Sequence, residues 1–210
     1  MSRIEQALKR EARELRPGAP TQAILDKLAK SAARRGLVDV AYTQADSPFG
    51  PLTLAATEQG LVLLAYPEND LEHALERLAE RISPRVLELP ARLEPVRRQL
   101  DQYFAGKRTR FDFPIDWRLA AAGFFERILR ATEEIPYGET ITYRQVAERA
   151  GNVKAVRAAG NGLGSNPIPI VVPCHRVVAT GGGMGGYTGG VDRKRYLLAL
   201  ERGDARLAGA

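Results

Sequence analysis

The chain is poor in the residues that build metal sites and disulfides. Its 210 residues include one cysteine, Cys174, and two histidines, His73 and His175. A structural zinc site needs four nitrogen or sulfur ligands, and these three side chains do not supply them. A single cysteine also excludes a disulfide within the chain, which favours a reducing compartment. We therefore expect neither a metal nor another cofactor.

Long apolar runs are missing as well. No stretch reaches the roughly 18 consecutive apolar residues of a transmembrane helix, and the charged N-terminus lacks the central apolar region of a secretory signal. We expect a soluble cytoplasmic protein with no membrane partner, associated with the nucleoid if the source is bacterial. A length of 210 residues fits one large domain or two small ones.

Positive charge is unevenly distributed along the chain. The net charge is +6 overall, with +5 in residues 1–38, −3 in residues 39–120 and +4 in residues 121–210. A basic C-terminal part beside an acidic middle favours a polyanionic partner such as nucleic acid. Basic patches are also common as plain solvated surface, so charge alone leaves both interpretations open.

The pattern of apolar residues predicts three parts. Residues 1–37 form a basic helical leader, with helices over 2–16 and 21–36 separated by the breaker Pro17-Gly18-Ala19-Pro20. Residues 38–116 form a small α+β domain with an antiparallel sheet, and residues 117–122 form a linker. Within this domain we expect strands over 38–42, 52–55 and 61–66 and helices over 70–82 and 93–105.

A mainly helical domain follows over residues 123–203. A helix over 123–135 precedes a second helix over 143–149 that Thr142 can cap, and a third helix begins near Val153. The short Gly-containing turn between the second and third helices predicts a helix-turn-helix. Many helix pairs share such a turn without binding DNA. Three glycines in the third helix, Gly160, Gly162 and Gly164, would let its backbone approach a ligand closely.

The candidate nucleophile lies in the segment Pro173-Cys174-His175-Arg176. A thiolate is the reactive form of cysteine, and a neighbouring imidazole can help to generate it. A free cysteine is also commonly a small buried apolar residue. The adjacent histidine and the glycine-rich loop over 181–190 favour the nucleophile.

These motifs together resemble one family. The chain is similar to the O6-alkylguanine-DNA alkyltransferases, the methylated-DNA–protein-cysteine methyltransferases, over about residues 41–203. The resemblance implies repair of DNA by irreversible, one-turnover transfer of the alkyl group from O6-alkylguanine to Cys174 after base flipping. The residues that carry it are Tyr137-Gly138-Glu139-Thr140, Thr142-Tyr143, Arg157, Asn166-Pro167, Pro173-Cys174-His175-Arg176 and Gly186-Tyr187-Thr188-Gly189-Gly190.

The same resemblance implies a role for each site residue. Cys174 would accept the alkyl group, His175 would take the thiol proton through a water molecule, Glu201 would orient His175, and Tyr143 would donate to N3 of the departing guanine. Arg157 would fill the space of the flipped base. The remaining expected contacts with DNA are Thr142, Ala158, Gly160 and Asn161, and the expected pocket residues are Asn166, Pro169, Val177, Tyr187, Thr188 and Lys194.

Two other functions stay open at this point. A non-catalytic alkyltransferase-like protein would bind the lesion and flag it, but such proteins lack the reactive cysteine. A helix-turn-helix regulator would need a dimer surface, and the sequence shows no clear one, so we expect a monomer on double-stranded DNA. The sequence does not determine cooperativity on DNA, the range of alkyl groups, activity on O4-alkylthymine or the role of the leader.

Overall fold

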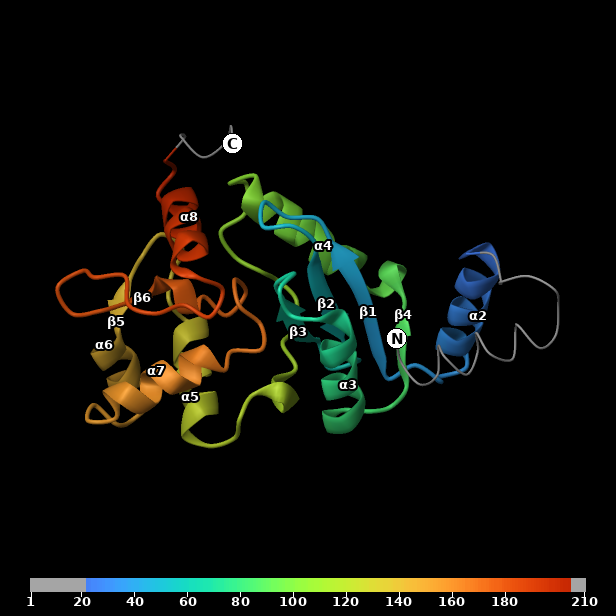
Figure 1. The fold of residues 1–210 in the computed structure, drawn as a ribbon, viewed down its shortest axis with the longest axis horizontal. Helices are drawn as coiled ribbons and strands as arrows, with labels where there is room; N and C mark the ends of the chain where they lie inside the picture. The colour runs from blue at the N-terminus through green and yellow to red at the C-terminus, as the bar shows by residue number, and fades with distance from the viewer. Residues whose placement is uncertain (1–21, 205–210) are drawn as a thin grey trace. The chain divides into compact units, whose positions relative to one another are not determined.

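The computed structural model describes residues 22–204, which form two compact units (Figure 1). The first comprises residues 22–98 and 113–119, and the second comprises residues 99–112 and 120–204. The helix expected over residues 2–16 and the turn after it lie outside the described residues. The helix expected next is α2, Gln22–Arg34. No helix among the described residues is long and apolar enough to cross a membrane.

The first unit is built on a four-stranded sheet of order β3-β2-β1-β4. The expected antiparallel strands are β1 (Val40–Ala45), β2 (Leu52–Ala56) and β3 (Leu61–Ala65). All five residues of β2 and of β3 are buried. A fourth strand, β4 (Val86–Glu88), pairs parallel to β1 and was not predicted, since three residues carry too little pattern.

Helices complete this unit. Asp70 caps α3 (Leu71–Arg81) by accepting from the backbone N–H of Glu72, and the buried face of α3 packs on the sheet. The next helix, α4 (Pro90–Phe104), begins in the first unit and ends in the second. A short 3-10 turn, η1 (Trp117–Leu119), lies within the segment expected as linker.

The second unit carries the helix-turn-helix. Its helices are α5 (Phe124–Glu133), α6 (Tyr143–Arg149), α7 (Val156–Gly164) and α8 (Val191–Glu201). Thr142 begins α6 with a capping box, in which Thr142 and Gln145 each satisfy the other's backbone N–H. A 3-10 turn, η2 (Cys174–Arg176), leads into β6 (Val177–Val178), which pairs parallel to β5 (Ile141–Thr142).

The glycines of α7 serve two purposes. A Cβ on Gly162 would lie 3.3 Å from Phe125 and 3.4 Å from Ile128 of α5, so this glycine allows close packing of two helices. A Cβ on Gly160 would point toward Tyr143 at 3.9 Å instead. The glycine pattern therefore reflects packing at Gly162 and an open groove only at its neighbours.

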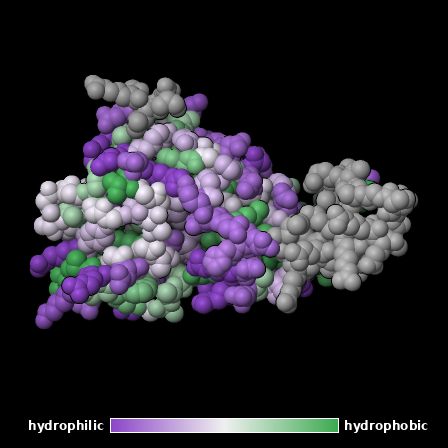
Figure 2. All heavy atoms as spheres, in the orientation of Figure 1, coloured by the Kyte–Doolittle hydropathy of each residue, from purple (hydrophilic) through white to green (hydrophobic). Residues whose placement is uncertain are grey.

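The outer surface at the start of α7 mixes apolar and charged residues. Figure 2 shows apolar surface next to strongly hydrophilic surface over α6 and α7, at the lower left of the view. The large apolar residues exposed in this region are Val153 and Val156, and Lys154 and Arg157 are exposed beside them.

Candidate active site

Cys174 occupies the first position of η2 and is buried, with 6% of its surface exposed. Burial raises the pKa of its thiol to about 11, because water that would stabilise a thiolate is excluded. A hydrogen bond from Asn166 and the charge of Lys194 oppose this effect only in part. At neutral pH the side chain is a thiol, and a base must remove its proton before it can react as a thiolate.

The loop before Cys174 is fixed by Asn166. Its Nδ2 donates to the Val172 carbonyl at 2.9 Å and to Cys174 Sγ at 3.2 Å, and its Oδ1 accepts from the Ile168 N–H at 3.0 Å. Within this loop Ile170 is buried and has a φ of 74°, a conformation that β-branched residues rarely adopt. Such strain persists only where the surroundings over-determine the backbone. The loop thus holds Sγ in one place.

His175 is fully buried and is held in one tautomer by Glu201. Its Nε2 lies 2.8 Å from Glu201 Oε1. Burial would raise the pKa of Glu201, but hydrogen bonds and charges from His175 and Arg176 outweigh it and hold that pKa well below its usual range. An ionised carboxylate only accepts hydrogen bonds, so Nε2 carries the hydrogen and Nδ1 is the basic nitrogen.

The basic nitrogen of His175 is available. Its Nδ1 is buried and has no hydrogen-bond partner among the described residues. Burial lowers the pKa of His175, against the opposing effect of Glu201, so the ring is neutral at neutral pH. A neutral imidazole with a free acceptor beside a thiol is suited to act as a general base.

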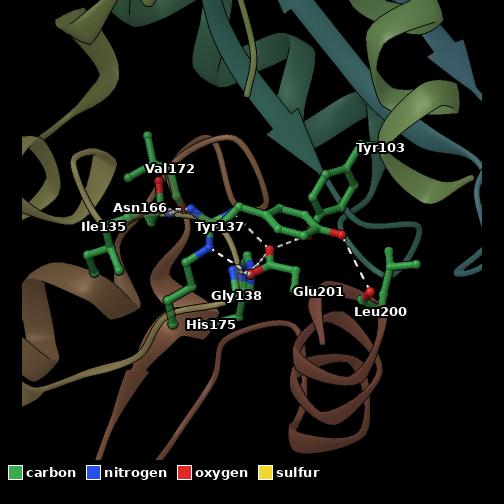
Figure 3. Close-up of polar contacts among 10 residues, drawn as sticks. Tyr103, Ile135, Tyr137, Gly138, Asn166, Val172, His175, Leu200 and Glu201 are labelled. Atoms are coloured by element: carbon green, nitrogen blue, oxygen red, sulfur yellow. Dashed lines mark hydrogen bonds and ion pairs between the residues drawn. The ribbon is translucent and has the colours of Figure 1, made fainter. Parts of the chain in front are cut away.

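Glu201 is the centre of a buried polar cluster at the C-terminus of α8, and Figure 3 shows it beside Tyr103, Gly138 and His175. Oε1 accepts from Tyr103 Oη at 2.6 Å and from Arg176 Nη2 at 2.9 Å, besides its contact with His175. Oε2 accepts from Arg176 Nε at 2.9 Å and from the Gly138 N–H at 3.1 Å. All the donors are aimed at one carboxylate, which therefore cannot rotate without losing several bonds.

Tyr143 begins α6 and reaches the glycine-rich loop, where its hydroxyl donates to the Gly186 carbonyl at 3.1 Å. Gly185 has a φ of 63°, and a Cβ there would lie 2.8 Å from Tyr143 Cε2 and Oη. Only glycine fits at this point of the loop. Burial is the main reason that the pKa of Tyr143 is raised, so the phenol keeps its proton.

Lys194 ties the same loop to the body of the unit. The ammonium is buried, donates to the Val177 carbonyl at 2.6 Å and to the Met184 carbonyl, and lies 5.9 Å from the ring centroid of Tyr143. Thr188 fastens the loop to the end of α7 by donating to the Gly164 carbonyl at 2.9 Å. These bonds place the loop over Tyr143.

A cleft of about 540 Å³ opens onto Cys174. A volume of this size is typical of small-molecule sites. Its walls come from the start of α6, from α7, from η2 and from the glycine-rich loop. The lining residues are Tyr143, Arg157, Gly160, Asn161, Leu163, Gly164, Cys174, Gly186, Tyr187 and Thr188.

The other residues expected at the site lie around the cleft rather than on its walls. Asn166 and Lys194 fix the loops on either side, and Val177 contributes its carbonyl to Lys194. Pro169 forms a bridge with Val172 in the strained loop. The two remaining expected DNA contacts, Thr142 and Ala158, are half-buried at the start of α6 and on α7.

Three contributors to the site were not among the residues expected to have a role of their own. Tyr103 is distant along the chain, in the last turn of α4, and belongs to no motif of the sequence. Gly138 contributes a backbone N–H, and Gly185 contributes the absence of a side chain. The sequence nevertheless singled out the segments of both glycines, the motif Tyr137-Gly138-Glu139-Thr140 and the glycine-rich loop over 181–190. The described residues contain no cluster of three His, Cys, Asp or Glu side chains that could hold a metal ion.

Comparison with known proteins identifies similar chains over both units. The family model described as the 6-O-methylguanine DNA methyltransferase DNA-binding domain matches residues 123–203. The model of the ribonuclease-like domain of 6-O-methylguanine DNA methyltransferase matches residues 40–117. These two matches together include every residue expected at the site.

Curated relatives and solved structures agree with these matches. The methylated-DNA–protein-cysteine methyltransferase of Mycobacterium tuberculosis is 42% identical over 164 residues, which are 78% of this chain and 93% of that protein. A protein of the same name from Methanosarcina acetivorans is 38% identical over 162 residues, 76% of this chain and 97% of that one. Crystal structures of the M. tuberculosis O6-methylguanine methyltransferase, alone and in complex with DNA, each have a TM-score of 0.68 at 40% identity, with 79% of this chain and 94% of that chain covered.

Proposed function

Because this chain belongs to the 6-O-methylguanine DNA methyltransferase family, we propose that it repairs DNA directly, by moving an alkyl group from O6 of guanine to Sγ of Cys174. The observation that carries the proposal is the pairing of a buried thiol at a cleft with an adjacent imidazole whose Nδ1 has no hydrogen-bond partner within residues 22–204. Double-stranded DNA with an O6-alkylguanine is the proposed partner, and a monomer is the proposed active form.

The thiol must first lose its proton. With the pKa of Cys174 raised to about 11, the thiolate is scarce at neutral pH. His175 Nδ1 accepts the proton, relayed through one water molecule, and the imidazolium that forms is stabilised by the ionised Glu201 on its other nitrogen. The charge of Lys194, which opposes the raised thiol pKa, favours the thiolate as it develops.

The transfer itself exchanges two bonds. The thiolate attacks the saturated carbon on O6, the carbon–sulfur bond forms, and the carbon–oxygen bond breaks with its electron pair passing into the guanine ring. Tyr143 donates its phenolic proton to guanine N3, so that the base leaves neutral. The tyrosinate then regains the proton that the imidazolium of His175 holds, and all charges return to their starting values.

The target base must leave the double helix to reach Sγ. Cys174 is 94% buried at the end of the cleft, beyond the reach of a base that stays stacked. Arg157 is exposed on α7 and lines the mouth of the cleft, where its side chain fills the space that the base vacates. The basic and apolar surface around Val153 and Val156 meets the DNA on either side.

The product is a thioether, which no group near the site can cleave. Each molecule therefore acts once. This property makes the reaction easy to count.

Intact-mass measurement after incubation with a duplex containing O6-methylguanine tests the proposal. We expect a single methyl adduct per molecule, and no adduct on a Cys174→Ala variant run in parallel. Selective binding to the lesion without an adduct would overturn the transfer and indicate a damage-flagging protein. Repeated turnover, with guanine released in excess over protein, would overturn the one-turnover proposal.

A further inference from the structure

We propose that Tyr103 is a positioning residue of the alkyl-transfer reaction, which it serves by setting the orientation and charge of Glu201. The inference rests on the proposed function, because Glu201 acts through His175 in that reaction. Tyr103 was not expected at the site from the sequence. It lies within residues 40–117, outside the segment 123–203 that matches the DNA-binding domain.

The contact geometry is tight. Tyr103 lies in the last turn of α4 and is 1% exposed, and its hydroxyl donates to Glu201 Oε1 at 2.6 Å. The same oxygen lies 2.8 Å from His175 Nε2 (Figure 3). A short bond to an ionised acceptor is among the stronger hydrogen bonds in proteins. Tyr103 and His175 are thus two of the three donors on a single atom, the third being Arg176 Nη2 at 2.9 Å.

The ring of Tyr103 is held by aromatic neighbours on several sides. Its centroid lies 5.5 Å from that of Phe104, 5.5 Å from that of Phe111 and 6.1 Å from that of Tyr137. These contacts prevent the hydroxyl from swinging away from Oε1. The segment over residues 99–112 therefore contributes a rigid donor to the cluster at the end of α8.

This donor also changes the electrostatics of the pair. Burial first, and then the proximity of Glu201, raise the pKa of Tyr103 well above its ordinary value, so the phenol remains a neutral donor. The hydrogen bond from Tyr103 partly neutralises the charge on Glu201 Oε1. The carboxylate therefore stabilises a protonated His175 less strongly than it would without Tyr103. The other charged groups that act on Glu201 and His175 are Arg176, on both, and Lys194, on His175; Tyr137 feels the charge of Glu201 but its hydroxyl bonds elsewhere. Arg176 binds both carboxylate oxygens, but Tyr103 donates to Oε1 alone.

The Tyr103→Phe substitution isolates this bond, because it keeps the ring and removes only the hydroxyl. Tyr137→Phe is the matched control. Tyr137 packs edge-on against Tyr103, but its hydroxyl contacts the Leu200 carbonyl at 3.4 Å and not the carboxylate. The rate constant of methyl transfer would be measured against pH in single-turnover reactions, and affinity for the lesion duplex would be measured in a Cys174→Ala background.

We expect Tyr103→Phe to slow transfer by about tenfold at neutral pH, the effect of one charge-assisted hydrogen bond. We also expect the acidic limb of the rate profile to move to higher pH, because Oε1 then pulls more strongly on a proton at His175. Affinity for the lesion should stay unchanged, and Tyr137→Phe should behave as the wild type does.

Nuclear magnetic resonance of the imidazole rings provides a second measurement. The chain has two histidines, so the His175 signal can be assigned against that of His73, which is exposed on α3. The pKa of His175 should rise by about half a unit or more in Tyr103→Phe.

The outcomes separate this proposal from the proposed function. An unaltered rate and an unshifted His175 titration in Tyr103→Phe would overturn the positioning role while the wild type still transfers its methyl group. If Tyr103→Phe and Tyr137→Phe slowed transfer equally and left the pH profiles unshifted, Tyr103 would contribute only packing. That result would also overturn the positioning role. Failure of the wild type to transfer at all would instead overturn the proposed function.

Discussion

Replacing Glu201 by glutamine tests the whole cluster at the end of α8. The carboxylate accepts five hydrogen bonds, three at Oε1 and two at Oε2. The glutamine side chain must place its NH₂ group where either Oε1 or Oε2 stood. At both positions the NH₂ group meets at least two N–H or O–H donors, and it cannot accept a hydrogen bond from any of them. The substitution also leaves the guanidinium of Arg176, which is 6% exposed, without its counter-charge.

We expect Glu201→Gln to lower both the stability of the protein and the rate of methyl transfer by a large amount. Two buried donors left without acceptors cost about 1–3 kcal/mol each, and breaking a buried ion pair by removing one partner typically costs about 3–5 kcal/mol. These figures overlap because they describe the same bonds, so we expect Glu201→Gln to lower the free energy of unfolding by about 3–5 kcal/mol. Methyl transfer should slow by about a hundredfold or more, since His175 loses its orienting partner.

Urea unfolding followed by circular dichroism measures the first effect, and single-turnover transfer at low temperature measures the second. Glu139→Gln is the control, because Glu139 is exposed in the turn after Gly138. This control should change the free energy of unfolding by less than about 0.5 kcal/mol. A Glu201→Gln variant within about 1 kcal/mol of the wild type would refute the argument that the charge of this carboxylate anchors the cluster.

Three further predictions concern pH, the glycine-rich loop and the leader. The pKa values of His175 and Glu201 in the folded protein lie below their ordinary values, so the unfolded chain binds more protons at acidic pH. Urea titrations should therefore show that the free energy of unfolding falls below about pH 6.5 through His175 and falls further below about pH 4.3 through Glu201. A free energy of unfolding that does not change with pH would contradict a buried neutral imidazole. Gly185→Ala should cost about 1–2 kcal/mol of unfolding free energy and slow transfer, because its Cβ would lie 2.8 Å from the Tyr143 ring; Gly183→Ala, whose Cβ would make only an ordinary contact with Ala179 at 3.7 Å, should behave as the wild type does in both assays. Deleting residues 1–36 removes a net charge of +5 and should make DNA affinity depend less steeply on salt concentration. If the slope of log affinity against log salt concentration stayed unchanged in binding titrations, a role for the leader in DNA binding would be excluded.

The sequence predicted those parts of the fold that depend on interactions between neighbouring residues. The Thr142 cap and the apolar runs of β2 and β3 depend on neighbouring residues, and the α+β fold class with its helix-turn-helix is confirmed. The parallel strand β4 was missed, because its place is set by pairing with β1, more than 40 residues earlier. Three residues alone do not specify a strand.

The candidate site residues also divide into those indicated by neighbouring residues and those that depend on contacts distant in the sequence. Cys174 and His175 could be proposed as the reacting pair from one tetrapeptide, because a thiol and a base must lie close together to react. Glu201 came only through the family resemblance, since a glutamate at the end of a helix is commonly exposed, whereas here it is 6% exposed. Tyr103 lies 98 positions before its partner and could not be found from spacing at all. Long-range hydrogen bonds leave no periodic signal in a sequence.

The raised pKa of Cys174 is consistent with the proposal that this side chain is a nucleophile used once. A thiolate exposed at neutral pH reacts with any soft electrophile and with oxidants, and a molecule that cannot regenerate its sulfur would be lost to each such event. Burial keeps the side chain as a thiol, with a pKa of about 11. In the proposed reaction, a flipped base that enters the cleft displaces solvent and strengthens the effect of the His175 base and of the Lys194 charge on the thiol. Deprotonation of Cys174 is thereby coupled, in this proposal, to occupation of the cleft, and the buried hydrogen bond from Glu201 holds His175 in position.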